Sequence, residues 1–230
     1  MKVYAISDLH LSTTVNKPMD IFGPSWQGHF DIIKQSWLQT VTQDDVVVLC
    51  GDLSWAMRAN EVITDLALFK DLPGKKIILR GNHDYWWNTI SQVRSLLPLN
   101  FYAIQNDCLR IGNVCFFGTR GWVMPENSNE QDKKIYSREI ERLKLSLLAL
   151  KKVRQEGDKV VCLTHFPPFN VNYELSEFIK LLIADDVHTV VYGHLHRSSC
   201  RAELRVNKFG IDFYLTSCDF ANNKLIEINI

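Results

Sequence analysis

Aspartate, histidine and asparagine side chains gather directly after five short apolar runs of the sequence. The blocks are Asp8-Leu9-His10, Gly51-Asp52, Gly81-Asn82-His83-Asp84, His165 and Gly193-His194-Leu195-His196. Each block alone has an ordinary explanation, because Asp, Asn and Gly form turns and a single histidine is more often structural. The Gly-His-x-His block is the most specific, since alternate residues of an extended chain point the same way. Imidazole and carboxylate together suit Mn, Fe, Zn or Co, whereas Mg or Ca favours an oxygen-only set.

The five apolar runs before these blocks, and one further run at residues 114–117, are predicted to be buried strands. They are rich in β-branched or aromatic residues and stop at polar residues or glycine. The predicted strands cover residues 3–6, 46–50, 77–79, 114–117, 160–163 and 189–192. Open α/β sheets place their ligands at the carboxyl ends of strands. The polar side chains of the five blocks are therefore candidates for one shared site.

Helical patterns lie between several of these strands. They cover residues 28–41, 58–70, 89–97, 133–155 and 174–183, and the fourth repeats leucine at helical spacing. Residues 202–206, 211–215 and 224–228 resemble three short antiparallel strands. Strands that alternate with helices and are followed by further strands indicate an α/β fold with a mixed sheet core and helices outside. No linker or repeat divides the chain, so one domain over residues 1–230 is predicted.

Composition narrows the class of protein further. The 230 residues include 26 basic and 26 acidic side chains, and this balance gives no support for a nucleic-acid or anionic-membrane partner. No run approaches the roughly 20 apolar residues of a membrane span. Asp8 interrupts the N-terminal apolar run before a signal-peptide core can form, so a cytoplasmic location is expected. The six cysteines contain no CxxC pair, and Cys50, Cys115 and Cys162 lie in apolar runs where reduced cysteine is a core residue.

The five blocks, in this order, resemble the calcineurin-like metallophosphoesterase superfamily, and they span residues 8 to 196. The resemblance implies a four-layer α/β/β/α fold, in which a β-sandwich is flanked by helices. It also implies two divalent transition-metal ions, with Mn expected and Fe, Zn or Co as alternatives. Carried over by position, the first metal would be held by Asp8, His10 and His196. The second would be held by Asn82, His165 and His194, with Asp52 bridging the two.

The resemblance also implies how such a centre works. Two ions about 3.5–4 Å apart clamp a phosphoryl group and supply a metal-bound hydroxide near neutral pH. The counterpart of His83 protonates the leaving oxygen or stabilises the charge that develops there. Asp84 would then orient His83 as a supporting carboxylate. We therefore expect hydrolysis of a phosphomonoester or phosphodiester of a small molecule.

Protein serine/threonine phosphatases share the run Arg80-Gly81-Asn82-His83, but they continue with Glu and carry Asp-Arg-Gly after the Gly-Asp block. Here Asp84 follows the run, and Leu53-Ser54-Trp55 follows Asp52. The sequence is more similar to an uncharacterised bacterial branch of predicted phosphohydrolases. The strings shared with that branch are Lys17-Pro18-Met19-Asp20, Ser54-Trp55-Ala56-Met57, Asp84-Tyr85-Trp86-Trp87 and Gly118-Thr119-Arg120-Gly121-Trp122. This branch indicates no substrate.

Three side chains are expected to bind substrate: Trp55 and Trp86, which lie near the metal blocks in the sequence, and Arg120. Aromatic walls beside a phosphate site can stack a nucleobase or cover an apolar ester group, although ordinary packing explains tryptophans equally well. A guanidinium group can grip phosphate in bidentate fashion. Residues 17–26 are expected to form a lid. His29 and His188 are expected to be structural.

Two alternatives to a simple phosphoesterase stay open. The first is a nucleotide or nucleotide-sugar pyrophosphatase with the same metal centre, favoured by the tryptophans and by the start Asp8-Leu9-His10-Leu11-Ser12. The second, from a different class, is a non-catalytic scaffold that only binds metal. The scaffold hypothesis is weaker, because a degenerate protein would lack a metal ligand or the counterpart of His83, and this sequence has them all. A serine hydrolase is unsupported, since no Gly-x-Ser-x-Gly motif occurs.

Overall fold

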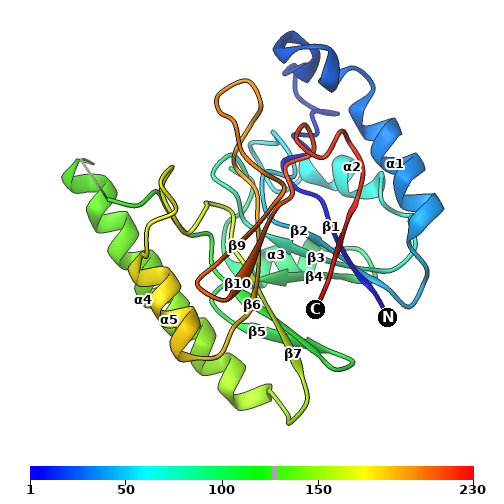
Figure 1. Ribbon diagram of the computed structural model, residues 1–230. Coiled ribbons are helices and arrows are strands. Elements are labelled where there is room, and N and C mark those ends of the chain that lie inside the picture. Colours follow the sequence, from blue (N-terminus) through cyan, green and yellow to red (C-terminus); the bar gives the residue numbers. More distant parts are fainter. Residues whose placement is uncertain (126–128) are drawn as a thin grey trace.

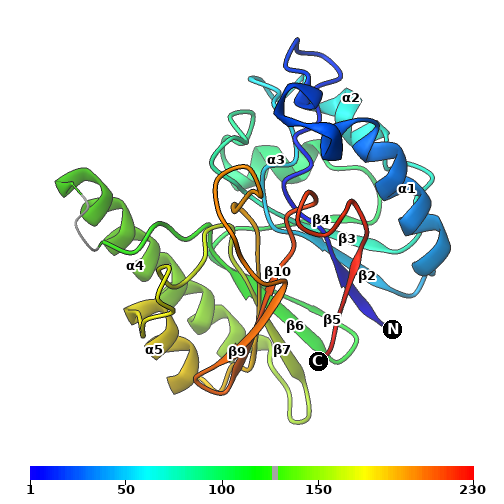
Figure 2. The same ribbon diagram turned by 45° about the horizontal axis from the view of Figure 1, so that its top comes forward.

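The computed structural model describes residues 1–125 and 129–230, and in it two β-sheets pack between two groups of helices (Figure 1). The first sheet has the order β11-β1-β2-β3-β4. Its strands are β1 (Val3–Ala5), β2 (Val46–Leu49), β3 (Lys75–Leu79), β4 (Phe101–Ile104) and β11 (Ile226–Ile228). β1 to β4 are parallel, whereas β11 is antiparallel to β1. The first and last strands of the chain are therefore neighbours, and the two termini lie side by side (Figure 2).

The second sheet has the order β5-β6-β7-β8-β10-β9. Its strands are β5 (Cys108–Ile111), β6 (Val114–Gly118), β7 (Lys159–Leu163), β8 (Thr189–Tyr192), β10 (Ile211–Leu215) and β9 (Arg205–Lys208). The four inner strands are parallel, and the edge strands β5 and β9 are antiparallel to their neighbours. The carboxyl ends of the parallel strands in each sheet therefore share one edge.

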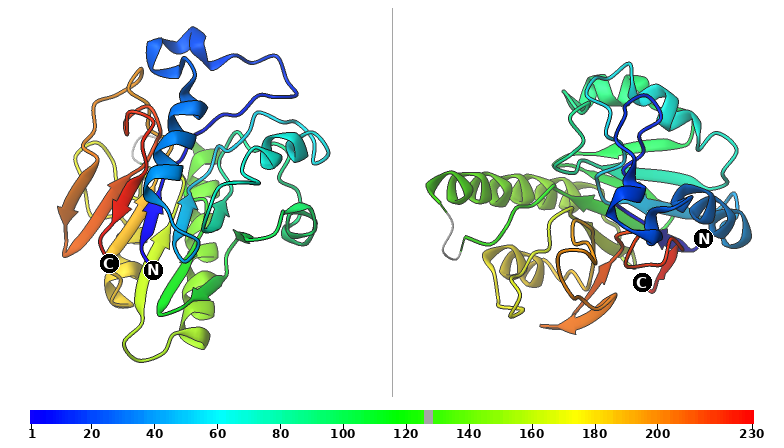
Figure 3. Two further views of the ribbon diagram at one scale, coloured as in Figure 1. Left: turned by 90° about the vertical axis from the view of Figure 1, so that its right-hand side faces the viewer. Right: turned by 90° about the horizontal axis from the view of Figure 1, so that it is seen from above.

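Helices cover the outer faces of both sheets (Figure 3). α1 (His29–Thr40), α2 (Val62–Ala67) and α3 (Ile90–Leu96) share a hydrophobic core with the first sheet. α4 (Glu130–Val153) and α5 (Glu177–Ala184) share another with the second sheet. Two short 3-10 helices, η1 (Met19–Phe22) and η2 (Pro24–Trp26), precede α1. The predicted four-layer α/β/β/α arrangement is confirmed.

Alternation along the strands creates these layers. In β2, Val46 and Val48 point into the core between the sheets, whereas Val47 and Leu49 point toward the helices. This is the two-residue period of a strand. Because both faces of each sheet are covered, central strands such as β2 and β7 contain continuous apolar runs, and these runs made them visible in the sequence.

Two strands were not predicted, and the arrangement predicted for the C-terminal strands was wrong. β4 and β5 follow one another closely, and β5 is a half-exposed edge strand that carries Arg110, so its pattern is not a continuous apolar run. The last three strands do not form one antiparallel group, because β11 joins the first sheet and β10 is parallel to β8. β9 starts later than predicted because its hairpin with β10 turns at Phe209 and Gly210, which both have positive φ, as a type I′ turn requires.

Two predictions about composition can be compared with the structure. Cys50, Cys115 and Cys162 are buried, as predicted, and all six cysteines are free thiols. Among the described residues, no helix combines the length and the apolar character needed to cross a membrane.

Candidate metal centre

Loops from both sheets meet at one edge of the sandwich. The loops after β1, β2 and β3 bring residues 8–10, 52 and 82–84 from the first sheet. The loops after β7 and β8 bring His165, His194 and His196 from the second. Backbone hydrogen bonds join the loops: the N–H of Asp8 donates to the carbonyl of Gly51, and the N–H of Gly193 donates to that of His165. The structure therefore brings the five sequence blocks together.

The first group of possible ligands contains Asp8, His10 and His196, whose ligand atoms all lie within 4.8 Å of one another. The Nε2 atoms of His10 and His196 are 3.4 Å apart. The Nε2 atom of His196 lies 3.9 Å from Oδ1 of Asp8. Asp8 and His10 are buried, whereas the side chain of His196 is 23% exposed. This group is thus reached from solvent on the His196 side.

The second group contains Asp8, Asp52 and His165. The Nε2 atom of His165 lies 3.5 Å from Oδ2 of Asp52 and 2.7 Å from Oδ1 of Asn82. The Oδ1 atom of Asn82 also lies 3.0 Å from Nδ1 of His194. All seven residues predicted as metal ligands therefore lie in one continuous cluster.

Asp52 lies between the two groups. Its Oδ2 atom is 3.8 Å from Nε2 of His10 in the first group and 3.5 Å from Nε2 of His165 in the second. Its Oδ1 atom accepts a hydrogen bond of 2.8 Å from the backbone N–H of His83. Among the described residues, the buried Oδ2 atom has no hydrogen-bond donor. A metal ion fits here, because an oxygen atom that faces two imidazoles and lacks a donor is suited to a shared cation.

The backbone around the centre adopts unusual conformations. Asp8, His10, Asp52 and His194 have φ values of 58°, 48°, 52° and 69°, in the left-handed region. Such conformations cost about 1–3 kcal/mol each and cluster at functional sites. The neighbouring glycines allow close approach: a Cβ on Gly193 would lie 2.4 Å from Oδ2 of Asp8. The loops are held in this arrangement by the surrounding structure.

Burial disfavours the charged form of both the carboxylate and the imidazole side chains in the cluster. It raises the pKa of Asp8 well above its usual range and that of Asp52 to about 6. Burial also lowers the pKa of His165 and His194 to about 3. Among the described residues, no lysine or arginine nitrogen lies within 4.0 Å of a carboxylate oxygen of Asp8 or Asp52. Two buried carboxylates without a cationic side chain fit a site for divalent cations.

Metal affinity is expected to fall about tenfold between pH 7 and pH 5. A carboxyl group with a pKa of about 6 holds a proton at pH 5, and that proton must leave before Asp52 can bind a cation. The raised pKa of His196 acts in the same direction. Isothermal titration of metal-free protein with Mn²⁺ at pH 5, 6 and 7 measures the effect. An affinity that does not change over this range would contradict the assignment of Asp52 as a ligand.

His83 lies beside the cluster but in neither ligand group. Its half-buried ring is 5.6 Å from that of His10 and 4.5 Å from that of Trp55. Its Nδ1 atom has no hydrogen-bond partner among the described residues. Burial lowers the pKa of His83, whereas the charge of Asp52 raises it. The ring lines a cleft together with His10 and His196, where it can contact a substrate.

Asp84 is placed differently from the expectation. Its two oxygens accept hydrogen bonds from the backbone N–H groups of residues 52, 53, 54 and 81, and from Nε1 of Trp86. Among the described residues, none of its hydrogen bonds involves His83. The structure therefore contradicts direct orientation of His83 by Asp84. Asp84 instead joins the Asp52 loop to the loop that carries His83, and burial raises its pKa to about 7.

The three expected substrate-binding residues have different positions. Trp55 lines a cleft beside the metal cluster. Trp86 is 1% exposed and bonded to Asp84, so direct contact with a substrate is contradicted. Arg120 lines a separate cavity, while its backbone carbonyl accepts from the N–H groups of His165 and Phe166. Of the three, only Trp55 lines the cleft beside the proposed ligands.

Sequence reasoning missed two residues that position ligands. Oδ1 of Asp219 lies 3.2 Å from Nδ1 of His196, and the hydroxyl of Ser217 donates to Oδ2 of Asp8 over 2.8 Å. Both follow β10, whose apolar run was predicted. The sequence Thr216-Ser217-Cys218-Asp219 carries the same signal as the five blocks, a polar group directly after a buried strand. Counting this strand end as a sixth block would have found them.

The chain was compared with known families and structures. A family model of calcineurin-like phosphoesterases matches residues 1–198. No curated protein matches the chain in sequence. Similar solved structures are a phosphopantetheinyl hydrolase from Mycobacterium tuberculosis (15% identity, TM-score 0.58) and the protein TT1561 of Thermus thermophilus (12% identity, TM-score 0.59). Each similarity covers 99% of this chain, with 95% of the first protein and 97% of the second.

A protein of unknown function from Aquifex aeolicus is also similar, with 15% identity and a TM-score of 0.50 over 98% of this chain and 95% of that one. At 12–15% identity these likenesses show a shared fold alone. The family match is stronger, because it includes all five strand-end blocks up to His196. The chain belongs to the calcineurin-like phosphoesterase family and is a phosphoester hydrolase.

Proposed function

We propose that this chain hydrolyses a phosphomonoester or phosphodiester of a small molecule at a centre of two divalent metal ions, with Mn²⁺ preferred. Asp8, His10 and His196 would hold one ion. Asn82, His165 and His194 would hold the other, and Asp52 would be shared. The observation that carries this proposal is the position of Asp52, whose Oδ2 atom faces imidazoles of both groups. When bound, such ions hold a phosphoryl group and activate water near neutral pH.

The imidazole of His83 is the proposed general acid. It lines a cleft of about 290 Å³ together with His10 and His196, so a leaving group in that cleft would meet its ring. The hydrogen bond from its backbone N–H to Asp52 fixes the ring's distance from the metal ligands. Asp84 supports this arrangement indirectly, because it bonds the backbone on both sides of the centre.

The walls of the cleft are aromatic and apolar. Met19, Phe22, Trp26 and Trp55 form them, and the first three belong to η1 and η2. The expected lid over residues 17–26 thus becomes a proposal that this segment covers the part of the substrate outside the phosphate. Flat apolar walls suit a nucleobase or an apolar ester group. The ammonium group of Lys17, 4.3 Å from the ring of Trp55, adds a positive charge at the rim.

A nucleotide or nucleotide-sugar pyrophosphatase is the second candidate. The observation that favours it is the same aromatic cleft, since a nucleobase can stack on Trp55 while a phosphate lies at the metals. The name of the Mycobacterium tuberculosis protein indicates a substrate with a phosphopantetheinyl group. A long, narrow chain of that kind would also suit the cleft, so the two classes need a direct comparison.

The experiment is hydrolysis of p-nitrophenyl phosphate and of bis-p-nitrophenyl phosphate by chelator-stripped protein, with and without Mn²⁺. Release of p-nitrophenol that requires added metal is the expected result, and the faster ester separates monoester from diester preference. A nucleotide sugar and a phosphopantetheine ester are tested beside them. No metal-dependent hydrolysis of any of these compounds would contradict the proposal and favour the metal-binding scaffold.

A further inference from the structure

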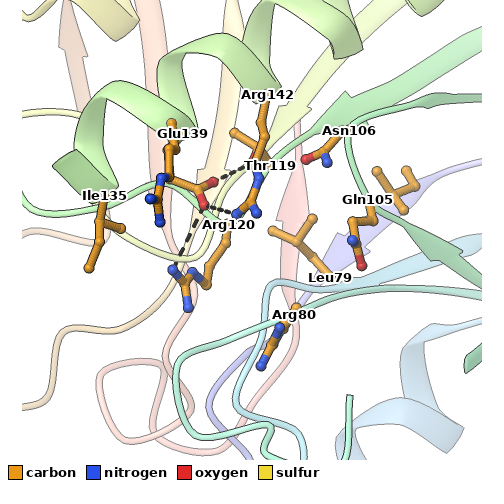
Figure 4. A pocket seen from close by; sticks show the side chains of 11 residues that line it. Leu79, Arg80, Gln105, Asn106, Thr119, Arg120, Ile135, Glu139 and Arg142 are labelled. Atoms are coloured by element: carbon orange, nitrogen blue, oxygen red, sulfur yellow. Dashed lines mark hydrogen bonds and ion pairs between the residues drawn. The ribbon is translucent and has the colours of Figure 1, made fainter. Parts of the chain in front are cut away.

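A second cavity, of about 220 Å³, lies between the ends of β3, β4 and β6 and the first half of α4 (Figure 4). Its polar lining includes Arg80, Gln105, Arg120, Arg138, Glu139 and Arg142. The lining therefore includes four arginines and one carboxylate, that of Glu139. None of the seven proposed metal ligands lines it, so it is distinct from the metal centre.

The carboxylate of Glu139 already accepts hydrogen bonds from neighbouring groups of the chain. It is 1% exposed and accepts hydrogen bonds from the hydroxyl of Thr119, the N–H of Gly121 and Nη1 of Arg142. Nη2 of Arg120 lies 3.8 Å from it. Figure 4 shows Arg120 and Arg142 both directed at this one carboxylate, with Arg80 further along the cavity. Glu139 can balance only one of the four positive charges.

The guanidinium of Arg120 lies 4.7 Å from the ring of Trp122, but the remaining positive charge has no carboxylate partner in the part of the chain that the structure describes. Arg80 and Arg138 form no ion pair with a described carboxylate. The buried Nε atoms of Arg80 and Arg120 have no hydrogen-bond acceptor among the described residues. Burial lowers the pKa of Arg120, and the charges of Arg80 and Arg142 lower it further. These guanidinium groups repel one another, and an anion in the cavity would relieve that repulsion.

The backbone of residues that line the basic cavity is connected to the loops of the metal centre. Arg80 precedes Asn82 by two residues. The carbonyl of Arg120 accepts hydrogen bonds of 2.9 Å from the N–H of His165 and 3.0 Å from that of Phe166. The charge of Arg120 also lowers the pKa of both Asp52 and His165. A group bound in this cavity therefore lies beside the loops that carry Asn82 and His165.

We propose that this basic cavity binds a second phosphate group of the substrate, and this rests on the proposed function. Guanidinium groups bind phosphate oxygens through paired, charge-assisted hydrogen bonds, and they match phosphate better than lysine does. The preferred substrate then carries two phosphate groups, one cleaved at the metals and one held by the arginines. Free inorganic phosphate offers the same chemistry, so the experiment has to separate it from a group on the substrate.

The first arm uses metal-free protein, so that no metal ion can hold the phosphate and the contribution of the arginine cavity is measured by itself. Calorimetric titration with inorganic phosphate is expected to show binding to the wild type that weakens about tenfold in Arg138→Gln, the loss expected for one charged hydrogen-bonding pair. Arg138 is exposed and unpaired among the described residues, so the variant is expected to fold. Lys152→Gln is the matched control, because it removes one charge from the same helix about 21 Å along its axis. Arg138→Lys is expected to restore part of the affinity.

The second arm measures inhibition of Mn²⁺-dependent hydrolysis of the better chromogenic ester, at equal free Mn²⁺. AMP offers one phosphate group, whereas ADP and adenosine 3′,5′-bisphosphate offer two. At least one of the compounds with two phosphates is expected to inhibit about tenfold more tightly than AMP, and Arg138→Gln is expected to remove most of that advantage. Lys152→Gln is expected to retain it.

The possible results distinguish three claims: the cavity as an anion site, the substrate assignment and the proposed function. No phosphate binding to metal-free wild type, or equal binding to Arg138→Gln, would overturn the cavity as an anion site. Phosphate binding without any inhibitory advantage for two phosphates would overturn the substrate assignment and leave free phosphate as the occupant. No hydrolysis of any ester would contradict the proposed function and the substrate assignment that rests on it, while the first arm would still decide whether the cavity binds phosphate.

Discussion

Replacing His83 with asparagine is expected to lower turnover of the Mn²⁺-loaded enzyme by about 10²–10⁴-fold, the usual contribution of a general acid. The metal content is expected to stay unchanged, because the imidazole lies outside both ligand groups. Asparagine keeps the backbone N–H that donates to Asp52. Turnover is measured by steady-state kinetics, and bound metal by elemental analysis after desalting.

Substrates with different leaving groups make this test more specific. A general acid matters most for a poor leaving group, so the loss is expected to be larger for an alkyl phosphate than for a p-nitrophenyl ester. His188→Asn is the matched control, since His188 is an exposed histidine at the start of β8, at the opposite end from the centre. Equal losses on both leaving groups would point to a structural role, and unchanged turnover would remove His83 from the mechanism.

Replacing Asp52 with asparagine is expected to remove both activity and metal. The substitution changes shape little, but it takes away the negative charge that faces His10 and His165. Loss of a supporting residue alone typically costs 10–100-fold in metal affinity, so loss of a direct ligand is expected to cost at least about 100-fold. Titration of the metal-free variant with Mn²⁺ measures the affinity, and elemental analysis counts the ions.

The control for this substitution is Asp71→Asn, because Asp71 is exposed and forms no ion pair with a described residue. Asp71→Asn makes the same chemical change at a residue outside the proposed metal centre. Retention of two tightly bound ions by Asp52→Asn would show that this carboxylate does not bridge them. Retention of a single ion would show that only one of the two ions depends strongly on this carboxylate.

The sandwich and the ligand cluster were predictable for the same physical reason. Covered sheets require continuous apolar strands such as β2 and β7, and the polar residue that ends each run then lies at the edge of the sheet. Strand β5 was not predicted, because it is only partly buried and carries the exposed Arg110 in place of an apolar side chain. The start of α4 was placed too late, although the side chain of Asn129 caps it by accepting from the N–H of Asp132.

The directions of individual side chains were less predictable. Asp84 and Trp86 lie two residues apart in a turn, and no periodic rule gives the orientation of turn residues. The carboxylate of Asp84 accepts hydrogen bonds from N–H groups of a different loop. These N–H groups come close to Asp84 only in the folded chain, so the sequence could not show that Asp84 faces the backbone and not His83. The basic cavity was missed for a similar reason, because Arg80, Arg120 and Arg142 are far apart in the sequence and share no motif.

The pairing of the first strand with the last has a consequence for how the protein is made. Val3 pairs with Ile228, and the carboxylate of Asp8 accepts from Ser217, so the candidate ligand Asp8 gains its partner only after β10 has been translated. His165, His194 and His196 also emerge from the ribosome late. A nascent chain that has completed β1 to β4 carries Asp8, Asp52 and Asn82 but none of these three histidines. Assembly of the complete set of candidate ligands is therefore expected only after β8 and the loop that follows it have been translated.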